Sequence, residues 1–119
     1  MNIAIIDDEK EILDILEKFL TKKGNRVTTY QNPVVALSSL KTDIDVVLLD
    51  VMMPQMNGLD LLPKLLEKYP KMKVIIMTAY STLDKVLDSH RGGAVFYVMK
   101  PFESLAKLEA KIIEVSQKK

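Results

Sequence analysis

The chain has 119 residues, of which 48% are hydrophobic, an amount that fits one globular domain with one core. Its 17 Lys and Arg residues against 16 Asp and Glu residues give a formal net charge of +1, so charge alone indicates neither a nucleic-acid nor a membrane surface. The absence of cysteine excludes disulfides and thiolate chemistry, and no apolar stretch approaches the ~20 residues of a membrane-spanning helix. We therefore expect one cytoplasmic domain over residues 1–119.

Short apolar runs alternate along the chain with stretches of helical spacing. Near-continuous hydrophobicity is typical of strands that are buried on both faces, as in parallel sheets covered by helices. The runs cover residues 3–6, 27–30, 46–49, 74–77 and 95–99. Right-handed crossovers between them predict an α/β fold with a doubly wound parallel sheet, strand order 2-1-3-4-5, and helices on both faces.

Local signals indicate where the intervening helices begin and end. Gly24 indicates the end of the first helix, Asn32-Pro33 predicts an N-cap followed by proline at the first helical position, and residues 81–84 (Ser-Thr-Leu-Asp) resemble a capping box. Pro63 lies within the third helical pattern, where an interior proline costs ~3 kcal/mol. We therefore expect that helix to begin near Asp60, with Pro63 in its first turn.

Polar residues follow the apolar runs at the end of the sheet where a doubly wound fold builds its site. They are Asp7, Asp8 and Glu9 after the first run, Asp50 after the third, Thr78 after the fourth, and Lys100 before Pro101 after the fifth. Since the carboxyl ends of parallel strands meet at one edge, we expect these side chains to converge there.

The Asp7-Asp8 pair has two interpretations. Aspartates favour helix starts, so the pair could provide an N-cap for the first helix. Alternatively, both face Asp50, and carboxylates packed that closely need a cation or take up a proton. Mg²⁺ fits the second interpretation, because it prefers oxygen ligands and is typically held by one or two carboxylates plus a phosphate.

Lys100 and Thr78 suggest a use for such a metal. Alone, Lys100 would be interpreted as a solvated surface cation. Beside carboxylates it offers a positive charge to a phosphoryl group, and Thr78 offers a hydroxyl donor. Asp50 can then act as a carboxylate nucleophile toward phosphorus.

These residues resemble the receiver domains of two-component response regulators, a family with a flavodoxin-like (βα)5 fold. The motifs that carry the resemblance are Ile6-Asp7-Asp8-Glu9, Leu48-Leu49-Asp50-Val51-Met52-Met53-Pro54 with Asn57-Gly58, Met77-Thr78-Ala79, Gly93-Ala94 and Lys100-Pro101-Phe102. Each motif is common by itself, whereas all of them in this order and spacing are specific.

The resemblance implies a role for each site residue. Asp50 corresponds to the phospho-acceptor, and Asp7, Asp8, Asp50 and the backbone carbonyl of Met52 to the Mg²⁺ ligands. Thr78 and Lys100 correspond to the phosphate-contacting pair, and Tyr97 to an aromatic that turns inward when the threonine moves. Met52 and Tyr80, both bulky, correspond to positions that tune phosphoryl lifetime. Lys100-Pro101 corresponds to a cis peptide bond.

The resemblance also implies partners and a switch. The phosphoryl group would come from a sensor histidine kinase or a phosphotransfer protein, and the domain would assist its own phosphorylation and slow dephosphorylation without multiple turnover. Phosphorylation would change the surface of the fourth helix, fifth strand and fifth helix, which then binds an output domain or a second copy of the chain. Its apolar residues are Leu83, Val86, Leu87, Val95 and Tyr97. Contact with nucleic acid or a membrane is not expected.

Three alternatives compete with this interpretation. A phosphatase of the haloacid dehalogenase type needs a second aspartate two residues after the nucleophile, where this chain has Met52. A flavodoxin-like nucleotide or flavin binder would have a glycine-rich first loop instead of Asp-Asp-Glu. A pseudo-receiver that only binds partners would not need the complete set of site residues.

Overall fold

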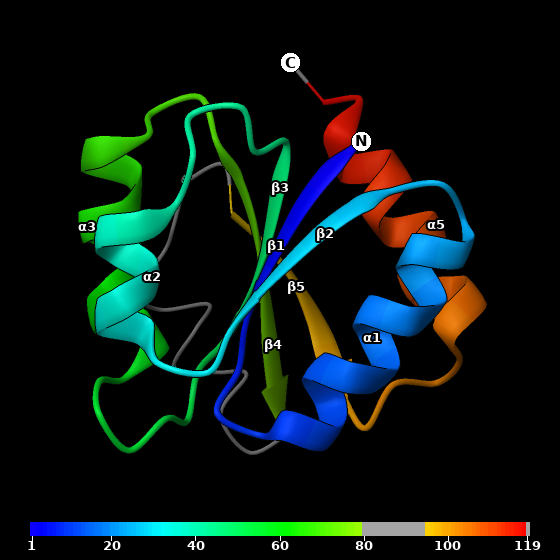
Figure 1. The fold of residues 1–119 in the computed structure, drawn as a ribbon, viewed down its shortest axis with the longest axis horizontal. Coiled ribbons are helices and arrows are strands. Elements are labelled where there is room, and N and C mark those ends of the chain that lie inside the picture. The colour runs from blue at the N-terminus through cyan, green and yellow to red at the C-terminus, as the bar shows by residue number, and fades with distance from the viewer. Residues whose placement is uncertain (80–94, 119) are drawn as a thin grey trace.

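The protein forms one parallel sheet between two layers of helices (Figure 1). The computed structural model describes residues 1–79 and 95–118. The strands are β1 (Asn2–Ile6), β2 (Arg26–Tyr30), β3 (Val46–Asp50), β4 (Lys73–Ala79) and β5 (Val95–Lys100). They pair in parallel in the order β2-β1-β3-β4-β5, which confirms the predicted fold.

The described helices cover the two faces of this sheet. They are α1 (Lys10–Lys22), α2 (Pro33–Ser39), α3 (Gly58–Lys68) and α5 (Leu105–Ser116). Helices α1 and α5 pack on one face, and α2 and α3 on the other (Figure 1).

Strand β3 shows why the central strands read as unbroken apolar runs. All of its residues are buried. Val46 and Leu48 belong to the core under α1 and α5, whereas Val47 and Leu49 belong to the core under α2 and α3. Successive side chains of a strand point to opposite faces, so a strand covered on both sides needs apolar residues at every position.

Among the described helices, the predicted end of α1 and start of α2 are confirmed, and the predicted start of α3 is the exception. The Asn32 side chain accepts a hydrogen bond from Val34 N at 2.8 Å, which confirms the predicted N-cap. Gly24 follows α1 with φ of 90°, a conformation that glycine adopts without steric cost.

The exception is α3, whose predicted start near Asp60 is wrong. The helix begins at Gly58 after the N-cap Asn57, so Pro63 lies inside it, beyond the first turn. The backbone at Pro63 has no N–H to donate to the preceding turn, yet the helix continues to Lys68. Buried Leu61, Leu62 and Leu65 anchor it on both sides of the proline.

Several predictions concern residues outside this description. Tyr80, the capping box at 81–84, Leu83, Val86 and Leu87 lie outside the described residues, as does the Gly93-Ala94 motif. Among residues 1–79 and 95–118, no helix combines the length and apolar character needed to cross a membrane.

Candidate functional site

The predicted site residues meet at the carboxyl edge of the sheet. Asp50 and Lys100 are the last residues of β3 and β5, and Thr78 lies one residue before the end of β4. Because Ile6 pairs with Leu49, the residues that follow them, Asp7 and Asp50, lie at the same level. The next pairs along the sheet are Asp50 with Met77 and Ala79 with Lys100.

Carboxylates crowd this edge. The side chains of Asp7, Asp8, Glu9 and Asp50 each offer an oxygen, and these oxygens lie within 4.8 Å of one another. Asp7 is 0% exposed and Asp50 is 5% exposed, so water screens their repulsion poorly. An all-oxygen set of this kind suits a hard divalent cation such as Mg²⁺.

Lys100 reaches into the cluster from β5. Its Nζ lies 2.6 Å from Asp7 Oδ2, 3.3 Å from Asp50 Oδ1 and 3.5 Å from Glu9 Oε1. Asp7 Oδ1 accepts a further hydrogen bond from Glu9 N at 2.9 Å, so both oxygens of Asp7 are engaged. Lys100 therefore ties the two buried aspartates to one amine.

The N-cap interpretation of Asp7 and Asp8 is wrong. The N-cap residue of α1 is Glu9, whose side chain makes no capping hydrogen bond. The helix start is held by backbone bonds instead, since Ile12 N and Leu13 N donate to the Glu9 carbonyl at 3.1 and 3.2 Å.

The surroundings of Asp50 make its ionisation costly. Burial, followed by the negative charge of Asp7, raises the pKa of Asp50 from 3.8 to about 7, although Lys100 acts in the opposite direction. Burial opposes protonation of Lys100, but its hydrogen bond to Asp7 and the nearby Asp50 charge outweigh this, so the pKa of Lys100 is raised. The site thus combines a carboxyl group of raised pKa with an amine of raised pKa.

A family model for the response regulator receiver domain matches residues 3–113. The chain belongs to the response regulator receiver family. It is 37% identical over 122 residues to the DNA-binding transcriptional regulator NtrC of Proteus hauseri, covering 99% of this chain and 26% of that protein. It is 35% identical over 101 residues to the response regulator SaeR of Staphylococcus aureus (strain USA300), covering 85% of this chain and 44% of that protein. The chain therefore spans about a quarter to under half of these relatives.

Solved structures agree with this assignment. The crystal structure of a response regulator receiver domain protein from Clostridium thermocellum superimposes with a TM-score of 0.85 at 31% identity, covering 97% of this chain and 93% of that chain. The receiver domain described here therefore shares the family fold over nearly its whole length.

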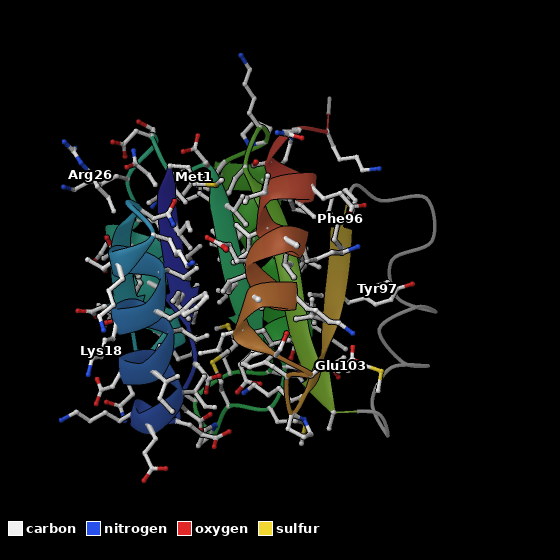
Figure 2. The ribbon with its side chains drawn as sticks, turned by 90° about the vertical axis from the view of Figure 1, so that its right-hand side faces the viewer. Met1, Lys18, Arg26, Phe96, Tyr97 and Glu103 are labelled. Atoms are coloured by element: carbon white, nitrogen blue, oxygen red, sulfur yellow. The ribbon has the colours of Figure 1, made fainter. Side chains whose placement is uncertain are left out.

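The structure also describes three other residues that were predicted for the site of this receiver domain. Thr78 is 1% exposed, and its Oγ1 donates to Ala79 O at 3.2 Å. Met52 is 64% exposed just beyond Asp50 in the chain. Tyr97 is 39% exposed on the edge strand β5 and points outward from the sheet, away from α5 (Figure 2). The Lys100-Pro101 peptide bond is cis, as predicted.

Gly58 contributes to the site in a way that its motif alone did not reveal. Its backbone N–H donates to Val51 O at 2.7 Å, so α3 begins directly against the strand end that carries Asp50. A Cβ at this position would lie 2.1 Å from Asp50 O and 2.9 Å from Val51 Cα. Only glycine permits this approach, and a glycine directly after the N-cap Asn57 was the available signal.

Gln31 is a second residue that sequence reasoning missed. Its side-chain Nε2 donates to the backbone carbonyl of Asp8 at 3.1 Å. The residue follows β2, and Asp7 N donates to Tyr30 O at 3.1 Å beside it. The end of β2 thus helps to hold the loop that presents the acidic pair, and its position after a strand was the available signal.

Proposed function

We propose that this receiver domain accepts a phosphoryl group on the carboxylate of Asp50, in a Mg²⁺-dependent reaction, from a sensor histidine kinase or a phosphotransfer protein. The observation that carries the proposal is the position of Asp50, buried at a strand end within 3.3 Å of the Lys100 amine and beside Asp7 and Asp8. A nucleophile in this setting is held rigidly, and a cation lies ready beside it.

Mg²⁺ would be held by Asp7, Asp8, Asp50 and the backbone carbonyl of Met52. Both oxygens of Asp7 are already engaged by Lys100 and Glu9 N, whereas no ion pair among the described residues involves Asp8. When bound, the metal offsets the carboxylate charges and those of the phosphoryl oxygens. It also favours ionised Asp50, whose pKa is otherwise raised.

The transfer step needs few protein groups. An oxygen of ionised Asp50 attacks phosphorus while the bond from phosphorus to the donor breaks, and the electron pair leaves with the donor. The Lys100 amine, which contacts Asp50 beforehand, can pair with a phosphoryl oxygen as negative charge builds there. Thr78, on the neighbouring strand, would donate a hydrogen bond from its hydroxyl to another of these oxygens.

Phosphorylation of Asp50 would change the conformation of one surface of the domain. Movement of Thr78 toward the phosphoryl group would make room for Tyr97 to turn inward from its exposed position on β5. The surface of the fourth helix, β5 and α5 would then favour a bound output domain or a second copy of the chain. A coupling of ~1–3 kcal/mol is usual for such links, so the unphosphorylated protein would already sample the active form.

The proposal includes no multiple turnover. Met52 occupies the position where a phosphatase of the haloacid dehalogenase type needs its second acid, and its thioether cannot transfer a proton. We further propose that this domain contacts neither nucleic acid nor membrane and that its location is cytoplasmic. The name of the NtrC relative states DNA binding for that protein, of which this chain covers 26%.

Mass spectrometry after incubation with acetyl phosphate and Mg²⁺ tests the phosphoryl transfer. The parent protein should gain one phosphoryl group and Asp50→Asn none, because an amide is a poor nucleophile. Asp45→Asn is the matched control at the opposite edge of the sheet and should behave like the parent. Equal incorporation in Asp50→Asn and the parent would refute the assignment of Asp50.

The switch has a separate test. Thr78→Ala should still accept a phosphoryl group on Asp50, but the surface that carries Tyr97 should no longer respond to it. The alanine side chain cannot donate a hydrogen bond to the phosphoryl oxygens. NMR of Tyr97 and sedimentation, each with and without beryllofluoride as a phosphoryl mimic, measure the response. If Thr78→Ala responds as the parent does, the threonine does not couple the site to the surface.

A further inference from the structure

Glu9 lies at the mouth of the acidic cluster and is not used by the proposed reaction. Its side chain is 61% exposed, in contrast to 0% for Asp7 and 7% for Asp50. Its carboxylate nonetheless lies 3.5 Å from the Lys100 amine. An incoming phosphoryl donor would therefore meet Glu9 in solvent before reaching the buried aspartates.

The backbone at Glu9 shows that this orientation is not required by the helix. Glu9 occupies the N-cap position of α1, where a side chain usually accepts a hydrogen bond from the first turn, but it makes no such bond. Its backbone carbonyl accepts from Ile12 N and Leu13 N. The side chain can therefore be changed without removing a side-chain cap, which separates its charge from the stability of α1.

The charge at this edge has opposite consequences for the two reactants. Carboxylate oxygens of Asp7, Asp8, Glu9 and Asp50 lie within 4.8 Å of one another. The amine of Lys100 forms ion pairs with three of these residues, namely Asp7, Glu9 and Asp50. A negative charge attracts a divalent cation and repels an anionic phosphoryl donor. A carboxylate that contacts Lys100 also competes with the phosphoryl oxygens for that amine.

We propose that Glu9, whose carboxylate contacts the Lys100 amine from the solvent side of the cluster, favours Mg²⁺ binding through its negative charge and slows attack on anionic phosphoryl donors. This inference rests on the proposed function of the site. It assigns to Glu9 a restraint on phosphorylation by small anionic donors.

Glu9→Gln separates these two effects, because it removes the charge and nearly preserves the shape. Calorimetric titration with Mg²⁺, without any phosphoryl donor, should give an affinity roughly threefold weaker than that of the parent. At saturating Mg²⁺, the rate of phosphorylation by acetyl phosphate should be roughly threefold faster. Both differences should shrink in ~1 M salt, where the screening length is only ~3 Å.

Two further variants control for charge and for folding. Glu11→Gln removes one charge from the same turn of α1 but lies outside the cluster, so it should resemble the parent in both measurements. Glu9→Asp keeps the charge and should restore most of the Mg²⁺ affinity. Thermal melting of each variant without metal verifies that α1 is intact.

The outcomes distinguish the inference from the function on which it rests. Opposite changes in affinity and rate support the role of Glu9. A loss of both would show that Glu9 only maintains structure, and no difference from Glu11→Gln would show that its charge has no role; either result overturns the proposal. If the parent accepts no phosphoryl group, the proposed function fails, and the Mg²⁺ titration still decides whether Glu9 favours the cation.

Discussion

At the amino end of the sheet polar groups pair with one another, whereas at the carboxyl end carboxylates face each other. Near the amino end, Asp45 Oδ2 accepts from Asn2 N at 2.7 Å, and Asn2 Nδ2 donates to Asp43 O at 3.1 Å. Lys73 Nζ donates to Ser116 O, the carbonyl of the last residue of α5, at 3.4 Å. At the carboxyl end, Asp7, Asp8, Glu9 and Asp50 converge.

The difference separates residues that stabilise the fold from residues that the fold must tolerate. Paired polar groups each contribute modestly to stability, commonly ~0.5–1.5 kcal/mol. At the carboxyl end, four converging carboxylates face the single amine of Lys100, and the charge that this amine leaves unbalanced opposes folding until a further cation or a proton joins them. Buried charges in a protein are usually paired with opposite charges, and a place where this rule is broken is expected to be a functional site. Here the rule is broken at the carboxyl edge of the sheet.

The largest expected effect comes from the close approach of α3 to the strand that carries Asp50. Gly58→Ala places a Cβ against backbone atoms, 2.1 Å from Asp50 O, and backbone cannot yield as a flexible side chain does. We expect a loss of about 3 kcal/mol in the free energy of unfolding, measured in urea, and weaker Mg²⁺ binding.

Gly24→Ala is the matched control at the other end of the sheet. It has φ of 90° and nothing within 4 Å, so it should lose only about 1 kcal/mol. Equal losses would mean that the close approach is not the cause.

The next effect is the pH dependence of stability without metal. The pKa of Asp50 is raised from 3.8 to about 7 in the folded protein, first by burial. A raised pKa means that the folded state binds this proton more tightly, so the contribution is complete below about pH 4 and is lost as the pH rises through about 7. Between pH 5 and pH 8 in EDTA, the parent should lose roughly 1–3 kcal/mol more than Asp50→Asn. Urea unfolding at both pH values measures this, and parallel losses in the two proteins would contradict it.

A smaller effect with opposite signs compares one aspartate from each end of the sheet. At pH 8 without metal, Asp8→Ala should raise the free energy of unfolding by about 0.5–1 kcal/mol, because it removes a carboxylate beside Asp50. Asp45→Ala should lower it by a similar amount, about 0.5–1 kcal/mol, because Asn2 N loses its acceptor. Urea unfolding of both variants measures these changes in the free energy of unfolding. A loss of stability in both variants would contradict the proposed difference between the two ends of the sheet. Asp8→Ala should also bind Mg²⁺ more weakly.

Much of this arrangement could be predicted from the sequence because it depends on periodic patterns. Short runs rich in apolar and β-branched residues identified the strands, and residues that directly follow such runs must lie at one edge of a parallel sheet. Asp7, Asp50 and Lys100 were placed together in this way. The roles proposed for Met52, Tyr80 and Tyr97 came from the family resemblance and remain predictions.

Other features depend on tertiary contacts that no local pattern contains. Helix α3 begins where Gly58 fits against the Asp50 carbonyl. The helix propensities of Asp60 and Pro63 contain no information on this contact. The sequence placed Glu9 and Lys100 at the same edge of the sheet, but the contact of the Glu9 carboxylate with the Lys100 amine at 3.5 Å depends on side-chain directions that only the folded chain shows.

The smallest expected effect lies within the carboxyl edge itself and concerns how long a phosphoryl group would survive on Asp50. Met52 follows Asp50 by two residues and is 64% exposed, and its side chain is predicted to cover one side of the approach to Asp50. Tyr80, which lies outside the described residues, follows Thr78 by two residues and is predicted to cover another side. Two bulky side chains should hinder in-line attack by water. The double variant Met52→Asn, Tyr80→Ala should therefore lose its phosphoryl group roughly threefold faster, a change of under about 1 kcal/mol in the barrier.

The decay of phosphorylated protein, followed by mass spectrometry after the donor is removed, gives the rate. Ile113→Asn replaces an exposed apolar residue on α5, away from this edge, and should leave the rate unchanged. An unaltered lifetime in the double variant would show that water reaches the phosphoryl group along a path that these side chains do not cover.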